Sequence, residues 1–281
     1  MMRRKTIKAY TYIAPALVIA FMFSIYPFLK TFICSFLTVN QKGKILGFAF
    51  LDNYKLLFSD KSFLNSVMNT LLFMVMFVPL NTVFTLSAAA LTRKKRKYSA
   101  IAETIFFSPM AISLAGASIT FSLLFRGRVS IINRIFGISI NWLGERMPAM
   151  LVLVLLGIFL DFGIDYIILL TAFKSSDKEA IEAAMLDGAD NLTLFFYIEL
   201  PMIKNTVIAT VFLAIKDALL IVAPILIVTE GGPFRSTETV MFYYYIEAFK
   251  SSNRAVANTL SVVLVSFALF FMALGTRKRL K

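Results

Sequence analysis

The stretch PAMLVLVLLGIFLDFGIDYIILLTAF, residues 148–173, is apolar almost throughout, and Asp161 and Asp165 are its only charged residues. About twenty apolar residues in a helix cross the roughly 30 Å hydrocarbon core of a bilayer, so this stretch is long enough to do so. The two aspartates are four residues apart, which places them on one face of the helix. The stretch therefore predicts a membrane span with one polar face.

The composition of the whole chain agrees with a membrane protein. Of 281 residues, 59% are hydrophobic and only 16% are charged, and the mean hydropathy is +0.79. A soluble domain has about a quarter of its residues charged, so this chain has too few charges to cover a water-soluble surface. The net charge of +13 is concentrated in basic clusters that flank apolar runs, which is typical of membrane orientation signals and not of nucleic-acid binding. These clusters are Arg3–Lys8, Arg93–Lys97 and Arg277–Lys281.

The residue types that the chain lacks limit its chemistry. It has no histidine and one cysteine, Cys34. A disulfide within the chain, a His/Cys metal site and catalysis with a histidine base are therefore excluded. We expect no catalytic residue and no metal site.

Six apolar segments have the length of a spanning helix, and the sequence predicts an all-α membrane protein with one transmembrane domain over residues 1–281. The segments are 10–35, 66–91, 100–125, 148–173, 203–228 and 254–275. With six spans, the connections on the side of the termini carry 16 Lys and Arg in 54 residues, and those on the other side carry 10 in 77. Because positive charge is enriched on the cytoplasmic side, we expect both termini in the cytoplasm and a multi-pass protein of the cell (inner) membrane.

The cytoplasmic connection 174–204, KSSDKEAIEAAMLDGADNLTLFFYIELPMIK, has the pattern of a helix, a turn and a second helix. Ser176 and Glu179 form a capping-box pattern at the start of the first helix. Gly188 suits the left-handed residue that ends many helices. Asp190 or Asn191 can cap the second helix, and Pro201 suits the first turn of the span that follows.

Small and apolar residues on this loop indicate a contact surface. Ala180, Ala183 and Ala184 would form a smooth stripe on the first helix, and Phe195 and Phe196 make the second part unusually apolar. An exposed apolar patch of this kind usually marks a contact. The alternative is a connector that folds back onto its own helix bundle.

The same loop resembles the EAA signature of permease subunits of binding-protein-dependent ABC importers. The matching positions are Glu182, Ala183, Ala184, Gly188, Ile198, Leu200 and Pro201. The resemblance implies that the loop forms coupling helices which dock into a cleft on a separate cytoplasmic ATPase. In that role Ala183 and Ala184 would allow close approach, Gly188 would make the turn, and Pro201 would begin the fifth span. Many members of the family have a proline where this chain has Ser176.

Further motifs resemble the carbohydrate-type permeases, and in particular their MalF-like first permease branch. They are Tyr12–Leu17, Tyr26-Pro27, Leu51–Tyr54, Asn69–Leu71, Asn141–Gly144 and Gly231–Pro233, with Glu230 where the family often has a third glycine. The resemblance implies a second, MalG-like permease, two ABC ATPase subunits and an external or periplasmic substrate-binding protein. The cargo would be a sugar, an oligosaccharide or sn-glycerol 3-phosphate. The chain has no G-x-x-x-x-G-K-[ST] loop, so ATP and Mg²⁺ would bind to the partner ATPase, and this chain would be no enzyme and hold no cofactor.

Charged residues inside the spans have two readings. Asp161 and Asp165 of the fourth span, and Lys216 and Asp217 of the fifth, could line a substrate path. Alternatively, they could form interhelical pairs, such as either aspartate with Lys216, or contact the partner permease. In a secondary transporter driven by an ion gradient, which is the rival class, they would form an ion relay. A membrane-embedded enzyme is a further alternative.

Overall fold

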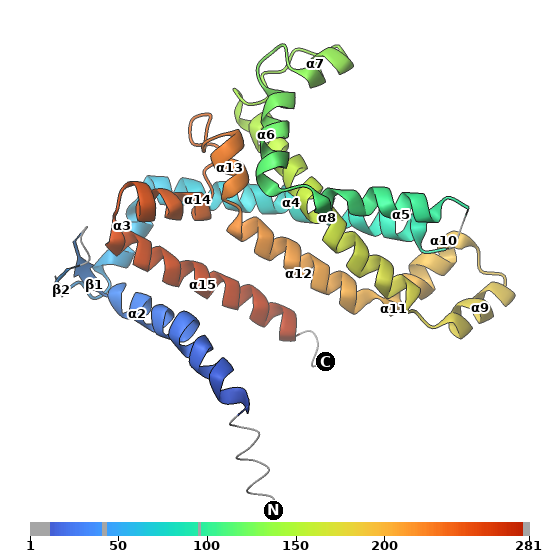
Figure 1. The fold of residues 1–281 in the computed structure, drawn as a ribbon, viewed down its shortest axis with the longest axis horizontal. Coiled ribbons are helices and arrows are strands. Elements are labelled where there is room, and N and C mark those ends of the chain that lie inside the picture. The colour runs from blue at the N-terminus through green and yellow to red at the C-terminus, as the bar shows by residue number, and fades with distance from the viewer. Residues whose placement is uncertain (1–11, 41–43, 95–96, 278–281) are drawn as a thin grey trace, which may run out of the picture. The chain divides into compact units, whose positions relative to one another are not determined.

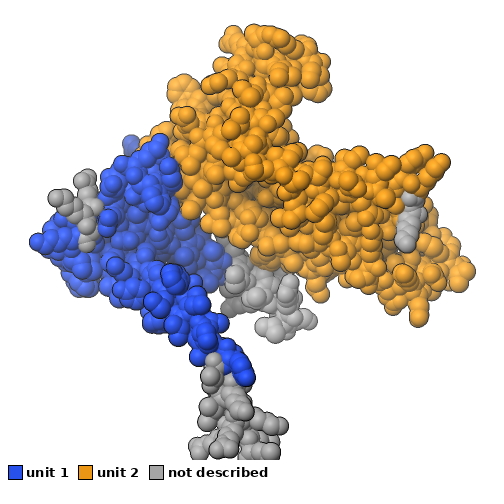
Figure 2. All heavy atoms as spheres, in the orientation of Figure 1, with its two compact units in different colours: residues 1–61, 244–271 blue, residues 62–243, 272–281 orange. Residues whose placement is uncertain are grey.

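The computed structural model describes residues 12–40, 44–94 and 97–277, with side chains up to residue 270. Arg3–Lys8, residues 95–96 and residues 278–281 lie outside the described residues, and so does the start of the first predicted span. Helices make up most of the described chain (Figure 1). The chain divides into two compact units, residues 1–61 with 244–271 and residues 62–243 with 272–281 (Figure 2). The single domain over 1–281 remains a prediction.

The first unit combines long helices with a small hairpin. Helix Tyr12–Cys34 includes η1 (Phe21–Ile25) and α2 (Tyr26–Cys34), and it covers the first predicted span. The hairpin pairs β1 (Leu37–Val39) antiparallel with β2 (Ile45–Phe48), with Leu37 opposite Phe48. The all-α class holds for most of the described chain, and this hairpin in the connection after the first predicted span was not predicted; its β-branched residues Thr38, Val39 and Ile45 favour a strand. The unit also contains α3 (Asp52–Ser59), η4 (Ile246–Lys250) and most of α15 (Arg254–Arg277).

The second unit is built around two long apolar helices, α4 (Lys61–Thr92) and α8 (Arg146–Lys174). Phe73 and Phe77 of α4 stack with ring centroids 5.3 Å apart and are buried. A Cβ placed on Gly157 of α8 would lie 3.1 Å from the Phe77 ring, so the missing side chain lets the two helices approach closely. Pro79 lies inside α4 without ending it. The remaining helices of this unit are α5 (Ser99–Phe107), η2 (Ser108–Ala111), α6 (Leu114–Phe125), α7 (Ile131–Phe136), α9 (Lys178–Leu186), α10 (Asn191–Thr193), η3 (Leu194–Glu199), α11 (Leu200–Met202), α12 (Lys204–Leu220), α13 (Ala223–Val228) and α14 (Val240–Tyr245), whose last two residues belong to the first unit.

The third predicted span, 100–125, is not one straight helix. The helical segments Ser99–Ala111 and Leu114–Phe125 meet at 96°, a bend visible between α5 and α6 in Figure 1. Pro109 sits at the start of the 3₁₀ turn and lacks an N–H, and Ser113 caps a new helix by accepting a hydrogen bond from the Gly116 N–H at 3.1 Å. The sequence therefore contained both signals for this break within the predicted span 100–125.

The fifth predicted span, 203–228, is broken as well. α12 ends at Leu220, Ile221 and Val222 leave the helix, and α13 starts with Pro224 in its first turn. A helical N–H at Pro224 would have bonded to the carbonyl of Leu220, and proline has none. The hydroxyl of Thr239 donates to the carbonyl of Ile221 at 3.1 Å, which satisfies one of the backbone groups at the break.

The described residues contain three helices long and apolar enough to cross a membrane, or five if each sharply bent pair counts as one span. The three are Tyr12–Cys34, Lys61–Thr92 and Arg146–Lys174, which correspond to the first, second and fourth predicted spans. Arg254–Phe270, in the place of the sixth, is a shorter apolar helix within the described residues.

Candidate functional site

The first half of loop 174–204 is a capped helix. The Asp177 carboxylate accepts a hydrogen bond from the Glu179 N–H at 3.0 Å, so Asp177 is the N-cap of α9. The predicted cap, Ser176, lies just beyond α8 and donates its hydroxyl back to the carbonyl of Ala172 in the last turn of that helix, at 3.1 Å. The capping-box prediction is wrong by one residue.

A left-handed glycine ends α9, as predicted. Gly188 has φ +87°, and the N–H of Ala189 donates to the carbonyl of Ala184 at 3.0 Å. This is the hydrogen-bond pattern of a helix that closes on a residue with positive φ. A Cβ on Gly188 would meet no atom within 4 Å, so only the backbone conformation demands glycine here.

Asp190 caps the second helical segment of the loop, which runs over α10, η3 and α11. Its carboxylate accepts from the Thr193 N–H at 2.8 Å. Hydrogen bonds from the Thr193 side chain and N–H hold the pKa of Asp190 below its ordinary value. The segment Asn191–Met202 meets α12 at 72°, with Ile203 at the corner. Pro201 therefore lies at the end of this segment and does not begin the fifth span, which corrects the role given to it above.

The two halves of the loop differ in burial. Within α9, no residue is buried, and Glu182, Ala183, Met185 and Leu186 are exposed, Leu186 at 89%. Residues 191–203 do pack back onto the second unit, through an apolar cluster that includes Leu169, Leu170, Phe173, Phe195, Leu200 and Ile203. The second half of the loop therefore folds back onto its own helix bundle, which was one of the two alternatives. The first half, α9, is exposed, as the other alternative, a contact surface, requires.

Of the signature residues in the second half, Ile198 and Leu200 are half-buried and Pro201 is exposed, while Ala184 in α9 is half-buried. Exposed apolar side chains remain beside them at Leu192 and Tyr197. A surface of this composition can bury apolar area against a partner.

A buried ion pair beneath the loop was not foreseen. Nε of Arg93 lies 2.7 and 2.8 Å from the two carboxylate oxygens of Glu199, and the two side chains are 12% and 6% exposed. Removing one partner of such a pair costs about 3–5 kcal/mol, because the other charge is left buried. The signal in the sequence was an acid in the middle of the apolar run FFYIELP.

The polar residues predicted inside the spans do not pair as suggested. Asp165 is buried and accepts a hydrogen bond from Nδ2 of Asn81 at 2.7 Å, while the Asn81 side-chain oxygen is buried without a partner. Lys216 forms its ion pair with its neighbour Asp217 at 2.8 Å, and not with Asp161 or Asp165. Asp165 therefore fits an interhelical contact whose partner, on α4, the sequence did not indicate.

Asp161 and Asp217 line a cavity of about 220 Å³ beside the break of the fifth span. Aromatic and apolar residues form most of its wall, including Phe73, Phe77, Leu114 and residues 220–224. Substrate sites of transporters commonly lie where a spanning helix is interrupted, because unpaired backbone groups face the cavity there. The structure thus brings two of the four predicted path residues into one cavity.

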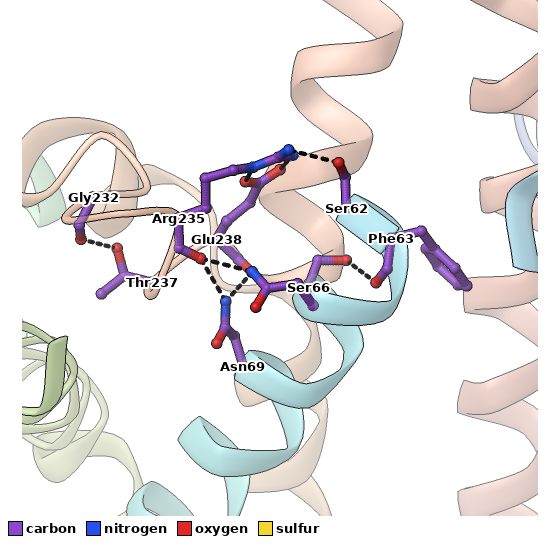
Figure 3. Close-up of polar contacts among 9 residues, drawn as sticks. Ser62, Phe63, Ser66, Asn69, Gly232, Arg235, Thr237 and Glu238 are labelled. Carbon is purple, nitrogen blue, oxygen red and sulfur yellow. Dashed lines mark hydrogen bonds and ion pairs between the residues drawn. The ribbon is translucent and has the colours of Figure 1, made fainter. Parts of the chain in front are cut away.

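The segment that follows α13 is clamped to the start of α4 (Figure 3). Gly231, Phe234 and Arg235 have positive φ, and the peptide bond between Gly232 and Pro233 is cis. Nδ2 of Asn69 donates to the carbonyls of Arg235 at 2.8 Å and Glu238 at 3.0 Å. The Arg235 guanidinium forms two hydrogen bonds with the buried Glu238 carboxylate and a third with the Ser62 hydroxyl. This clamp, residues 231–239 on residues 62–70, was not predicted beyond the Gly231–Pro233 motif.

Solved structures identify the class of the fold. The chain superimposes with a TM-score of 0.84 on a chain from the crystal structure of a bacterial ABC transporter involved in the import of the acidic polysaccharide alginate, with 18% identity and 99% of each chain covered. A second structure, the alginate transporter in complex with an alginate pentasaccharide-bound periplasmic protein, gives the same TM-score at 16% identity, over 97% of this chain and 93% of that one. The fold is that of an ABC transporter chain.

Curated relatives identify the family. The osmoprotective compounds uptake permease protein GgtC of Synechocystis sp. is 32% identical over 95% of this chain and 97% of its own length. The lactose transport system permease protein LacF of Rhizobium radiobacter is 28% identical (97% and 95% covered), and the trehalose/maltose permease protein MalF of Thermococcus litoralis is 27% identical (96% and 94%). No protein-family model matches the chain. The chain belongs to the family of ABC importer permease subunits, which are transport components of the membrane.

Proposed function

We propose that this chain forms one half of the translocation path of an importer and couples that path to a separate ATPase through loop 174–204. The supporting observation is the contrast within the loop: α9 exposes Glu182, Ala183 and Leu186, while residues 191–203 are anchored in the core of the second unit. A force on the exposed half would reach the spans through the anchored half. Alternation between inward- and outward-facing states would follow as a rigid-body movement.

The full assembly in this proposal has six spans in this chain, with both termini in the cytoplasm. A second, MalG-like permease would complete the path, two ATPase subunits would bind ATP and Mg²⁺, and an external binding protein would deliver the cargo. Family membership supports this assembly, and so does the structure of a similar transporter in complex with a periplasmic protein. We propose no cofactor or metal for this chain itself.

For the cargo we propose a sugar, an oligosaccharide or sn-glycerol 3-phosphate. Relatives carry names for osmoprotective compounds, lactose, trehalose and maltose, and sn-glycerol 3-phosphate. The cavity supports a hydroxyl-rich ligand, because Asp161 and Asp217 line it and their carboxylates can accept hydrogen bonds. We place Asp161, Lys216 and Asp217 on the path, and assign Asp165 to helix packing with Asn81.

Uptake by the reconstituted complex tests this proposal. We expect proteoliposomes that contain this chain, its permease partner, the ATPase and the binding protein to accumulate one of radiolabelled trehalose, lactose or sn-glycerol 3-phosphate. Accumulation should require ATP on the ATPase side and should persist when an ionophore collapses the ion gradients. Uptake that continues without ATP and stops with the ionophore would contradict the proposal.

The Asp161→Asn variant should reduce that uptake about tenfold while the complex still assembles, because one hydrogen-bond acceptor of about 1.4 kcal/mol is altered in the cavity. Asp165→Ala should instead lower the thermal stability, because the Asn81 amide would then have no partner. Uptake rate, gel-filtration profile and unfolding midpoint of both variants separate the two roles. Loss of assembly in Asp161→Asn would show a structural role for Asp161.

A further inference from the structure

Arg93 connects three segments of the second unit that meet beneath loop 174–204. Its Nη1 donates to the carbonyl of Ala90 at the end of α4, and its Nε contacts the Glu199 carboxylate of η3. The guanidinium carbon lies 5.9 Å from the ring centroid of Phe173, at the end of α8, and 5.3 Å from that of Phe195 in η3. One side chain therefore contacts α4, α8 and the second half of the loop.

The Arg93–Glu199 ion pair is not needed to hold α4, α8 and the second half of the loop together. The apolar cluster that contains Ala89, Leu170, Phe173 and Ile203 already packs the three segments together. A buried ion pair adds little net stability, since well-packed apolar residues of similar volume often replace it without loss. What a buried pair does supply is a defined geometry, because a planar guanidinium and a carboxylate keep their hydrogen bonds only over a narrow range of positions.

We propose that Arg93 and Glu199 are positioning residues for energy coupling: their pair fixes the orientation of residues 191–202 on the ends of α4 and α8, so that movement of α9 is passed to the spans. α9 packs directly on η3, which carries Glu199. The route is thus α9, η3, the ion pair and α4. The inference rests on the proposed docking of loop 174–204 on an ATPase.

A second contact between the end of α4 and residues 191–202 supplies a matched control. Lys94, the residue after Arg93, donates from Nζ to the side-chain oxygen of Asn191 at 2.8 Å, but this contact is exposed to solvent. Exposed polar contacts of this kind contribute little. Lys94→Ala therefore removes a link between α4 and residues 191–202 without removing a defined buried geometry.

The test measures movement of the spans per ATP hydrolysed, without knowledge of the cargo. Cys34→Ser first removes the native thiol of this chain, and Ala223→Cys then places a new thiol in the cavity wall. In the full complex, the rate at which a maleimide labels this thiol is measured with and without ATP. We expect ATP to change the labelling rate in this background. Glu199→Gln and the double variant Arg93→Met with Glu199→Leu should reduce that change per ATP hydrolysed about tenfold, a typical size for a coupling effect. ATPase retention should stay normal in both, and Lys94→Ala should differ by no more than about twofold.

The outcomes separate this inference from the proposal beneath it. A double variant with the ATP response of the wild type would overturn the positioning role, and so would a double variant that fails to assemble, because the pair would then serve assembly. If Gly188→Val retains both the ATPase and the ATP response, docking through the loop is wrong. If Gly188→Val releases the ATPase while the Arg93 and Glu199 variants respond normally, only the positioning role is wrong.

Discussion

Gly188→Val is expected to abolish ATP-driven uptake and to release the ATPase from the complex. Gly188 has φ +87°, and the hydrogen bond from Ala189 to Ala184 depends on that conformation. A residue with a side chain costs about 1–2 kcal/mol in the left-handed region, and a β-branched residue is a particular outlier there. Space is open around the position, so the effect comes from the backbone and not from a clash. The orientation of α9 relative to residues 191–202 would then change, and α9 would present a different face.

Gly188→Asn is the matched control, because asparagine tolerates the left-handed region. It should keep most of the uptake and should retain the ATPase on purification through a tag on this chain. Uptake in proteoliposomes and the ATPase-to-permease ratio after gel filtration are the two measurements. Normal uptake together with a normal ratio in Gly188→Val would refute the coupling role of the loop.

Asn69→Leu is expected to lower the thermal unfolding midpoint of the complex by about 5–10 °C and to reduce uptake strongly. The buried amide of Asn69 donates to two carbonyls of the clamp, those of Arg235 and Glu238. Leucine has a similar volume but no donor, so a buried carbonyl is left unpaired at a cost of about 1–3 kcal/mol. In a chain of this size each kcal/mol shifts the midpoint by about 2–4 °C.

Asn65→Leu provides the comparison. Asn65 donates to the same carbonyl of Arg235 at 2.9 Å, but it is exposed and water can replace it. Its midpoint should stay close to that of the wild type. The midpoints come from gel filtration in detergent after heating for a fixed time. Equal losses in the two variants would mean that burial of the Asn69 amide is not what holds the clamp.

The length of the apolar segments predicted the long apolar helices. The spans expected at 66–91 and 148–173 lie within α4 and α8, and the one at 254–275 within α15. The length of an apolar segment does not show whether a proline within it interrupts the helix. Pro79 lies inside a continuous α4, whereas the chain bends by 96° at the 3₁₀ turn Ser108–Ala111, which contains Pro109.

The bend at residues 108–113 has two local signals, Pro109 and the Ser113 cap, and it is also the place of a close tertiary contact. At this bend, between α5 and α6, Gly163 of α8 allows the turn to approach closely. A Cβ on Gly163 would lie 3.2 Å from Cβ of Met110 and 3.3 Å from the carbonyl oxygen of Phe107. The close approach joins positions more than fifty residues apart in the sequence, and local patterns do not contain it. The packing of this turn against α8 therefore cannot be read from propensity alone.

The candidate site shows the same limit. Local chemistry predicted the turn at Gly188 and offered Asp190 as one of two candidate caps, because both features depend on residues a few positions away. The partners of Asp165 and Glu199 come from α4 and its end, 84 and 106 residues distant. The sequence could mark these acids as costly in an apolar run, but it could not say which side chain offsets the cost.

The absence of any buried residue within α9 has a consequence for the life of the subunit before assembly. A helix of nine residues is marginal in water, and here the Asp177 cap, the Gly188 turn and its packing on η3 stabilise it. Segments of low local stability open first and are the sites that proteases cut. If an ATPase docks on α9 as proposed, it would cover this segment, so we expect proteases to cut residues 177–190 faster in a copy without its ATPase.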